Sequence, residues 1–264
     1  MILMTGKEVV NEMLKNKKCN AKKVAIFVNE EDEASKVYVK NKSKKFESIG
    51  IECDLISTNE DLWKVHSEVA KLKEKKIPYM FQLPLSNNIL SSFCDNIPLK
   101  LDIDSMGMEA QGAFYKKPDA WNTPCTPLGI YFMLKHYIPE DKLLNKNVVV
   151  IGRSAIVGRP MARVMEYYFN STVTVCHSKT NNLEFYTKNA DIIIIAIGKA
   201  NFLTVDMIKK DAILVDVGIN RDINGKLCGD VNFESCKEKA YAISPVPKGV
   251  GVTTVGSLVY KCLL

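Results

Sequence analysis

Apolar and polar positions follow two periods that alternate along the whole chain. Short apolar runs, such as VAIFV at residues 24–28 and ADIIIIAIG at residues 190–198, are long enough for buried strands and too short for helices. Between these runs lie longer stretches, such as residues 61–76, whose apolar positions are three and four residues apart, the period of a helix with one buried face. Strands that alternate with helices in this way predict a parallel α/β architecture.

The alternation occurs in two series. The first predicts helices at 7–14, 33–48 and 61–76 and strands at 24–28, 51–57, 79–85 and 101–104, the last a short strand or an extended loop. The segment TPCTPLGI then marks a boundary, after which Thr126 can cap a helix with Pro127 at its first position. The second series predicts strands at 148–151, 171–178, 190–198, 212–220 and 242–247, followed by a terminal helix at 253–264.

Composition and charge narrow the class of protein. A chain of 264 residues is long for one core and comfortable for two domains. The net charge of +6 is spread over many lysines, with no arginine-rich or aromatic-interleaved stripe, so an anionic small molecule is a better candidate ligand than nucleic acid. The eight cysteines are scattered without ligand spacing, so we expect reduced thiols and no metal site.

Location follows from what the chain lacks. The first ten residues show no signal-peptide pattern, and the longest apolar run is too short to span a bilayer. We therefore expect a cytoplasmic protein without a membrane partner.

One stretch predicts a phosphate-binding turn. In VVVIGRSAIVGRP, residues 148–160, a buried strand ends at Gly152, a turn carries Ser154 and Gly158, and a helix begins around Pro160. Such a strand–turn–helix directs backbone N–H groups and the positive end of the helix dipole at one spot, which suits a phosphate. Because the spacing departs from GxGxxG, an ordinary tight turn of an α/β domain stays open as an alternative.

The loop after the next strand adds a cofactor preference. Ser178 follows Gly152 by 178 − 152 = 26 positions, roughly where dinucleotide-binding folds place the residue that contacts the adenosine ribose. An acid there would bind a free 2′-hydroxyl and repel a 2′-phosphate, whereas this loop offers hydroxyls and a cation, with Arg153 nearby. The loop favours NADP over NAD, and a solvated polar loop is the alternative.

Polar residues also fall near strand ends of the first series. Tyr38 and Lys42 are four positions apart on a predicted helix and project from one face. Such a lysine usually extends to water, but a desolvated one has a lowered pKa and can exchange a proton near neutral pH. Gln82 lies at the end of an apolar strand. Asp102 and Asp104 lie on one side of an extended segment, and their carboxylates could either be solvated at the surface or act in metal binding or acid–base catalysis.

Several motifs in order resemble one known family. They are YVKNK (38–42), QLPL (82–85), DID (102–104), TPCTP (123–127), GRSAIVGRP (152–160), CHSKT (176–180), DVGIN (216–220), GDV (229–231) and PVPKGVG (245–251). Together they resemble the bifunctional methylenetetrahydrofolate dehydrogenase/methenyltetrahydrofolate cyclohydrolases, and the resemblance covers nearly the whole chain.

The resemblance implies two αβ domains that flank a cleft, the second a Rossmann-type doubly wound parallel sheet. Residues 1–125 would form the folate-binding catalytic domain, joined by the C-terminal helix 248–264, and residues 126–247 would bind NADP. The implied reactions, part of one-carbon metabolism and purine biosynthesis, are oxidation of methylenetetrahydrofolate by NADP and hydrolysis of the methenyl product to formyltetrahydrofolate. Family members are commonly homodimers, so we expect one here.

Residue roles follow only from the resemblance. Lys42 is similar to the essential lysine of the hydrolytic step, Gln82 to its hydrogen-bonding partner, Tyr38 to the aromatic residue that stacks on folate, and Asp104 to the carboxylate that binds the pterin. The residues implied to bind the cofactor are Gly152, Arg153, Ser154, Val157, Gly158, His177, Ser178 and Ile219. Pro247 and Gly251 are implied to contact the substrate with Tyr38 and Asp104.

The chain also departs from the family's pattern. Ser105 and Lys248 stand where the family usually has glycine, Ser86 where it has proline, and Ala110 aligns with a usual asparagine. Val252 and Thr253 replace a proline and a methionine. These changes leave two alternatives, a dehydrogenase without the hydrolytic step and a catalytically silent nucleotide-binding module. The presence of all four residues at positions 38, 42, 82 and 104 argues against the silent module.

Overall fold

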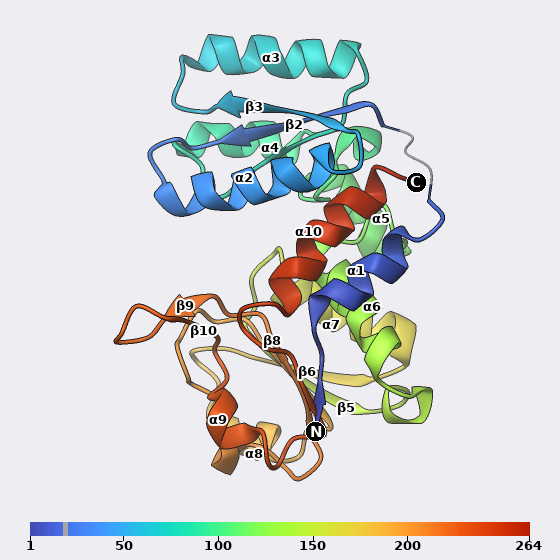
Figure 1. The fold of residues 1–264 in the computed structure, drawn as a ribbon, viewed down its shortest axis with the longest axis vertical. Helices are drawn as coiled ribbons and strands as arrows, with labels where there is room; N and C mark the ends of the chain where they lie inside the picture. The colour runs from blue at the N-terminus through green and yellow to red at the C-terminus, as the bar shows by residue number, and fades with distance from the viewer. Residues whose placement is uncertain (18–20) are drawn as a thin grey trace. The chain divides into compact units, whose positions relative to one another are not determined.

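The structure, a computed structural model, describes residues 1–17 and 21–264 (Figure 1). It divides into two compact units. Unit 1 comprises Met1–Leu14 and Thr126–Ser257, and unit 2 comprises Lys15–Cys125 and Leu258–Leu264. Each unit is built on a parallel sheet with helices, so the predicted α/β class is confirmed. No helix in the described part of the chain combines the length and the apolar character needed to cross a membrane.

Unit 2 contains a three-stranded parallel sheet in the order β3–β2–β4. The strands are β2 (Lys23–Val28), β3 (Glu52–Ser57) and β4 (Tyr79–Phe81). The helices are α2 (Glu33–Glu47), α3 (Leu62–Glu74), α4 (Ser91–Asp95) and α5 (Met108–Lys116), with 3-10 turns η1 (Asn88–Leu90) and η2 (Leu99–Leu101). Both pairings of β2 are in parallel register, as the apolar runs predicted.

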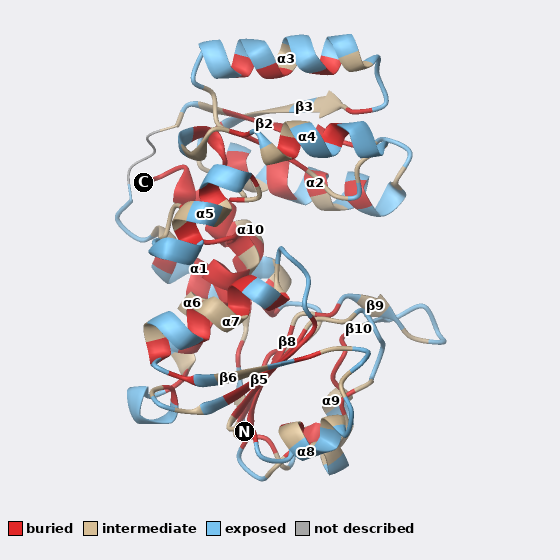
Figure 2. Cartoon of the chain, turned by 180° about the vertical axis from the view of Figure 1, so that it is seen from behind, coloured by how far each residue is buried: buried red, intermediate tan, exposed pale blue. Residues whose placement is uncertain are grey.

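Aromatic side chains form the centre of the unit 2 core. The ring of Phe27 on the middle strand stacks on Phe81 with centroids 4.3 Å apart, and Tyr79 meets both rings edge-on. Val65 and Val69 of α3 belong to the same cluster. The buried residues of α3 lie on the side of the helix that faces the sheet (Figure 2). The apolar face predicted for this helix is therefore the face that packs on the sheet.

Unit 1 contains a six-stranded sheet, all parallel, in the order β1–β11–β8–β7–β5–β6. The strands are β1 (Ile2–Leu3), β5 (Asn147–Ile151), β6 (Thr172–Cys176), β7 (Ile192–Ile195), β8 (Ile213–Asp216) and β11 (Ala242–Ile243), and β9 (Asn220–Arg221) pairs separately with β10 (Leu227–Cys228). The helices of this unit include α1 (Gly6–Leu14), α7 (Gly158–Phe169), α8 (Leu183–Thr187) and α9 (Phe233–Cys236), with 3-10 turns η3 (Glu140–Lys142) and η4 (Val205–Met207).

The strand order of unit 1 fixes where a ligand can bind. After β5 the chain moves to β6 on one side, and then to β7 and β8 on the other side of β5. The point between β5 and β7 is therefore a topological switch point, where open α/β sheets bind ligands beyond the carboxyl ends of their strands. This doubly wound arrangement confirms the Rossmann-type sheet.

Element boundaries differ from the sequence predictions in several places. Helix α6 (Cys125–Tyr137) starts before Thr126, so this threonine lies inside the helix and is not its N-cap. Strand β4 ends at Phe81 and does not reach residue 85, since Pro84 has no N–H to donate to a ladder. The segment expected as a fourth strand makes a single bridge, from Tyr79 to Asp102.

The ends of the chain also divide differently from the expected domains. Residues 1–14 belong to unit 1 because β1 pairs with β11, with Ile2 opposite Ala242. Helix α10 (Val250–Lys261) begins earlier than predicted, and its residues up to Ser257 belong to unit 1. In the expected domains, residues 1–14 and the whole C-terminal helix from 248 lay with the folate-binding part.

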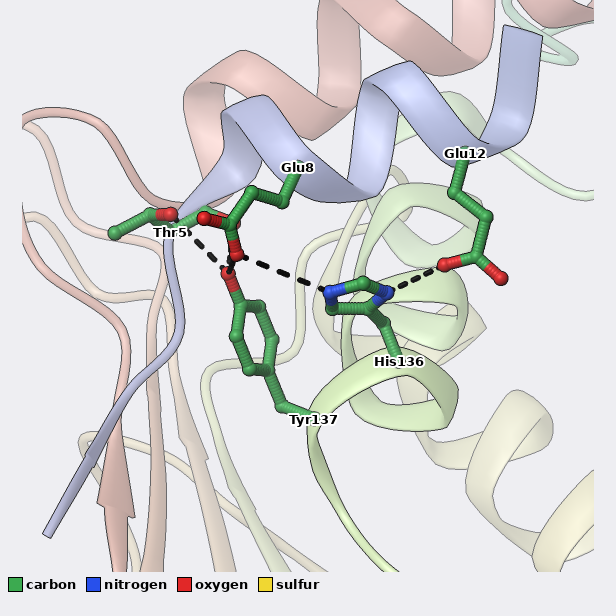
Figure 3. A network of polar contacts seen from close by, with 5 residues as sticks. All are labelled: Thr5, Glu8, Glu12, His136 and Tyr137. Carbon is green, nitrogen blue, oxygen red and sulfur yellow. Dashed lines mark hydrogen bonds and ion pairs between the residues drawn. The ribbon is translucent and has the colours of Figure 1, made fainter. Parts of the chain in front are cut away.

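Within unit 1, a polar network joins α1 to the end of α6 (Figure 3). The Tyr137 hydroxyl donates to the Glu8 carboxylate (2.9 Å) and lies 3.1 Å from the Thr5 hydroxyl. The His136 ring contacts Glu12 through Nδ1 and lies 4.0 Å from Glu8 through Nε2. This network fixes the first helix against the unit that contains β1.

Candidate active site

The structure places Lys42 inside unit 2. It lies on α2, whose start is fixed by Asp32, because this carboxylate accepts a hydrogen bond from Ser35 N (2.7 Å). Only 2% of Lys42 is exposed, so the lysine does not extend to water. Its Nζ donates to Gln82 Oε1 (2.8 Å) and lies 3.7 Å from Met80 Sδ.

Burial makes the charged form of Lys42 unfavourable. Desolvation lowers the pKa of this amine, and the carboxylate of Asp104 opposes the shift only in part. The other hydrogen bond of Gln82, from Nε2 to Leu83 O (2.8 Å), turns its Oε1 toward the lysine. The arrangement therefore holds an amine in one place and brings it closer to its neutral, proton-accepting form.

Tyr38 lies next to the lysine, as the spacing on one helix face predicted. The Lys42 Nζ is 4.9 Å from the centroid of the Tyr38 ring. Burial and the nearby Asp104 raise the pKa of Tyr38 to about 12, so its hydroxyl stays protonated at neutral pH. A flat aromatic ring, a carboxylate and a buried amine are thus neighbours in one unit.

The two aspartates of DID have different environments. Asp104 is half-buried and interacts electrostatically with Tyr38 and Lys42. Asp102 is fully buried, and its Oδ2 accepts a hydrogen bond from Gly107 N (2.7 Å). Of the two, only Asp104 is available to a ligand, and Asp102 holds the following loop.

A neighbour that the sequence did not single out is Cys125. It is fully buried, its Sγ donates to Ile103 O (3.2 Å), and burial raises its pKa well above the usual value. It interacts electrostatically with Lys42 and Asp104. Cys125 lies in the motif TPCTP, which marks the predicted boundary, and the spacing there gives no sign of a contact with Lys42.

In unit 1, two glycines shape the turn after β5. Gly152 has φ +121°, and a Cβ there would lie 2.4 Å from Ala196 O. A Cβ at Gly158 would lie 2.2 Å from Gly152 O. Ser154 Oγ accepts weak hydrogen bonds from Val157 N (3.2 Å) and Gly158 N (3.3 Å) at the start of α7. The turn therefore has no room for a side chain at either position. Because glycine has none, the backbone of the turn is open to a ligand at these two residues.

The loop after β6 has an ordered shape. His177 N donates to Thr180 Oγ1 (2.8 Å), and His177 Nδ1 accepts from Lys179 N (3.1 Å). Ser178 is exposed on this loop, and Arg153 is exposed after the adjacent strand β5. Both loops lie at the carboxyl edge of the sheet, where a ligand is expected.

Two buried carboxylates that sequence reasoning missed hold the other loops at this edge. Asp230 accepts hydrogen bonds from the N–H groups of residues 197–199 and from Asn220 Nδ2 (2.7–3.1 Å). Asp216 accepts from the N–H groups of Gly218, Asp230 and Val231, while burial raises its pKa to about 7. The motifs DVGIN and GDV contain both aspartates, but their spacing does not reveal that they fix loops.

The remaining predicted residues lie in unit 1. Gly251 and Ile219 are neighbours, since a Cβ on the glycine would meet Ile219 Cδ1 at 3.9 Å. Pro247 is exposed and follows a cis peptide bond. Lys248, where the resembling family has glycine, has φ +84°. Thus the structure brings Lys42, Gln82, Tyr38 and Asp104 together in unit 2, and it places Pro247 and Gly251 with the cofactor candidates.

Comparison with known proteins gives two family matches that together span most of the chain. Residues 3–104 match the tetrahydrofolate dehydrogenase/cyclohydrolase catalytic domain, and residues 124–264 match the NAD(P)-binding domain of the same family.

Individual proteins agree with these matches. The chain is 42% identical to a "Bifunctional protein FolD" from Wolbachia sp. subsp. Drosophila simulans, over 88% of this chain and 80% of the relative. The crystal structure of the bifunctional FolD enzyme of Campylobacter jejuni is similar at 35% identity, with a TM-score of 0.90 over 100% of this chain and 97% of that one. The Trypanosoma brucei FolD structure, complexed with NADP cofactor and an inhibitor, is 27% identical with a TM-score of 0.82, over 98% and 92% of the two chains.

Proposed function

Because this chain belongs to the tetrahydrofolate dehydrogenase/cyclohydrolase family, we propose that it catalyses both reactions of that family. In the first reaction, a hydride leaves the one-carbon bridge of methylenetetrahydrofolate and reduces NADP to NADPH. In the second, water adds to the methenyl cation and a proton is released, which yields formyltetrahydrofolate. The observation that carries the proposal is the buried Lys42, hydrogen-bonded to Gln82 and adjacent to Tyr38 and Asp104.

Lys42 is the proposed base of the hydrolytic step. The methenyl intermediate is a cation, so its arrival disfavours a neighbouring ammonium and adds to the effect of burial. The neutral amine then accepts a proton from the attacking water. Gln82 accepts a hydrogen bond from Lys42 Nζ and so keeps the amine in place through the step.

The proposed substrate contacts in unit 2 are Tyr38 and Asp104. The Tyr38 ring offers a flat apolar face on which the folate ring system stacks. The Asp104 carboxylate accepts hydrogen bonds from the N–H groups of the pterin edge. Hydride transfer needs little acid–base help, so for this step the residues serve to hold the reacting rings at contact distance.

The residues of unit 1 fit NADP, which accepts the hydride when bound. The cradle formed by Gly152 and Gly158 has no room for a Cβ, so backbone can approach a pyrophosphate at the start of α7. We propose that the pyrophosphate is held there with Ser154 and Val157, and that Ile219, Pro247 and Gly251 lie near the nicotinamide and folate. His177, Ser178 and Arg153 would bind the adenosine ribose and its 2′-phosphate.

We also propose a homodimer, as the family resemblance implies, and a cytoplasmic location. The domain roles follow in the same way, with folate bound by unit 2 and NADP by unit 1.

Rapid mixing of the protein with methylenetetrahydrofolate and NADP tests the function. We expect NADPH to form and the methenyl absorbance to decay faster than in a sample without protein. NADPH formation with only the spontaneous decay would indicate a dehydrogenase without the hydrolytic step. Absence of NADPH with NADP and with NAD would contradict the proposed activity.

A further inference from the structure

Unit 2 contains a second buried lysine that the proposed mechanism does not use. Lys261, at the end of α10, is 0% exposed, and its Nζ donates to Ser105 Oγ (2.5 Å). An ammonium removed from water is costly unless hydrogen bonds and an opposite charge compensate it. The neighbours of Lys261 must therefore supply both.

The first neighbour, Ser105, is held in an unusual backbone conformation. Its φ is +56°, in the left-handed region that costs a residue with a Cβ on the order of 1 kcal/mol. The Ser105 hydroxyl donates to Trp121 O (2.7 Å) and accepts from Lys261, and the Ser105 carbonyl accepts from Gln111 Nε2 (2.6 Å). These three contacts hold a serine in a conformation that glycine adopts without strain.

The second group is Asp102, a carboxylate that interacts electrostatically with Lys261. Its side chain is fully buried, and among the described residues its Oδ1 has no hydrogen-bond partner. Burial raises the pKa of Asp102, while the charge of Lys261 acts in the opposite direction and favours the ionised carboxylate. The charge of Lys261 thus offsets part of the cost of burying this carboxylate.

Asp104 lies between these two positions in the chain. The segment that carries it is fixed on one side by Asp102 and on the other by Ser105, and both interact with Lys261. We propose that Lys261 is a positioning residue for the folate substrate: it holds residues 102–105 so that the Asp104 carboxylate is directed at the pterin. The inference rests on the proposed function, and Lys261 itself does not touch the substrate.

Steady-state kinetics of Lys261→Met test this role. The variant keeps the length of the side chain but leaves Asp102 without its cation and Ser105 without a donor. We expect the KM for methylenetetrahydrofolate to rise about tenfold or more, while the KM for NADP stays within twofold, since the proposed NADP residues lie in unit 1. A second change, Asp102→Asn, removes the charge that Lys261 no longer offsets, so the double variant should recover part of the loss, and the part due to Ser105 should remain.

Two substitutions of Ser105 test the same role should Lys261→Met fail to fold. Ser105→Ala removes the hydroxyl and keeps the left-handed strain, whereas Ser105→Gly removes both. We expect the alanine variant to show the larger rise in the KM for methylenetetrahydrofolate.

The outcomes separate this role from the proposed function. An unchanged folate KM in Lys261→Met and Ser105→Ala, or an equal rise in both KM values, would overturn the positioning role. Neither result would affect the proposed function, which is tested separately by NADPH formation and by methenyl decay with the unmodified protein.

Discussion

Lys42 destabilises unit 2 while it serves the proposed reaction. Burial lowers its folded pKa below the ordinary 10.5, so the unfolded chain binds the proton more tightly. The resulting loss of stability is full below the folded pKa and disappears as the pH rises toward 10.5. At neutral pH the side chain therefore lowers the free energy of unfolding.

We expect Lys42→Met to raise the free energy of unfolding at pH 7 by about 1 kcal/mol or more, because it removes a buried charge that has no carboxylate at salt-bridge distance among the described residues. Urea unfolding at pH 7 and pH 10 measures this gain, which should shrink at the higher pH. Lys40→Met, at an exposed position of the same helix, is the matched control and should leave stability unchanged.

The same Lys42→Met protein should lose hydrolysis more completely than hydride transfer, because only hydrolysis uses the lysine as a base. Equal loss of both activities would mean that Lys42 only binds the substrate.

Lys248 is a second residue whose backbone conformation suits glycine. Its φ is +84°, a strained conformation for a residue with a Cβ, and its side chain is exposed. Among the described residues, its side chain makes no hydrogen bond that would compensate this strain. Lys248→Gly should therefore raise the free energy of unfolding by about 1 kcal/mol. Thermal unfolding gives the comparison, with Lys248→Ala as the control that removes the charge and keeps the strain. A gain of the same size in the alanine variant would show that charge, and not φ, is responsible.

The sequence predicts the role of some of these residues and gives no sign of others. Tyr38 and Lys42 are found from helical spacing, and Gln82 from its place after a strand. Lys261 has no such signal, because its contact with Ser105 joins positions 156 residues apart. A lysine in a terminal helix is ordinarily expected to extend to water. Whether this lysine is exposed or buried depends on packing between distant parts of the chain, and the local sequence pattern does not contain that information.

At the scale of elements, the loop after β6 carries the proposed cofactor preference. Ser178→Asp places a carboxylate beside the position proposed for the 2′-phosphate, so like charges repel. We expect the ratio of kcat/KM for NADP to that for NAD to fall at least tenfold. Ser178→Asn has a similar size without the charge and should shift the ratio far less. An unchanged ratio in the aspartate variant would remove this loop from the proposed site.

Helices and strands are predicted well as elements, and their ends are predicted less well. The sequence pattern identifies all strands of the two main sheets except β1. The clearest are β5, β7 and β8, short apolar runs that are buried along nearly their whole length. The starts of α6 and α10 and the end of β4 differ from the predicted positions by a few residues. Such ends depend on which carbonyl or N–H finds a partner in the folded unit, and composition does not specify that choice.

At the scale of the whole molecule, the resemblance implies a homodimer. Light scattering after size-exclusion chromatography should give about twice the chain mass of 29.6 kDa, independent of concentration in the micromolar range. Bovine serum albumin run in the same buffer calibrates the measurement. A mass near that of one chain would contradict the dimer and leave the proposed chemistry untouched.

The compact units divide the two ends of the chain differently from the expected domains. Chain order assigns residues 1–14 to the folate-binding domain, but β1 completes the sheet of unit 1. A two-residue strand is too short to show a period, and its partner lies at the opposite end of the sequence. The alternation of strands and helices in the second series, by contrast, is enough to predict the doubly wound sheet.

The two ends of the chain belong to different units, and this has a practical consequence. Residues 1–14 are part of unit 1, and residues 258–264 are part of unit 2. A fluorophore attached near the first residue therefore reports on the unit that is proposed to bind the dinucleotide, and one attached near the last reports on the other. Purification tags follow the same logic: a tag at the first residue is attached to unit 1 and a tag at the last residue to unit 2, so comparing both placements separates an effect of the tag from a property of the enzyme.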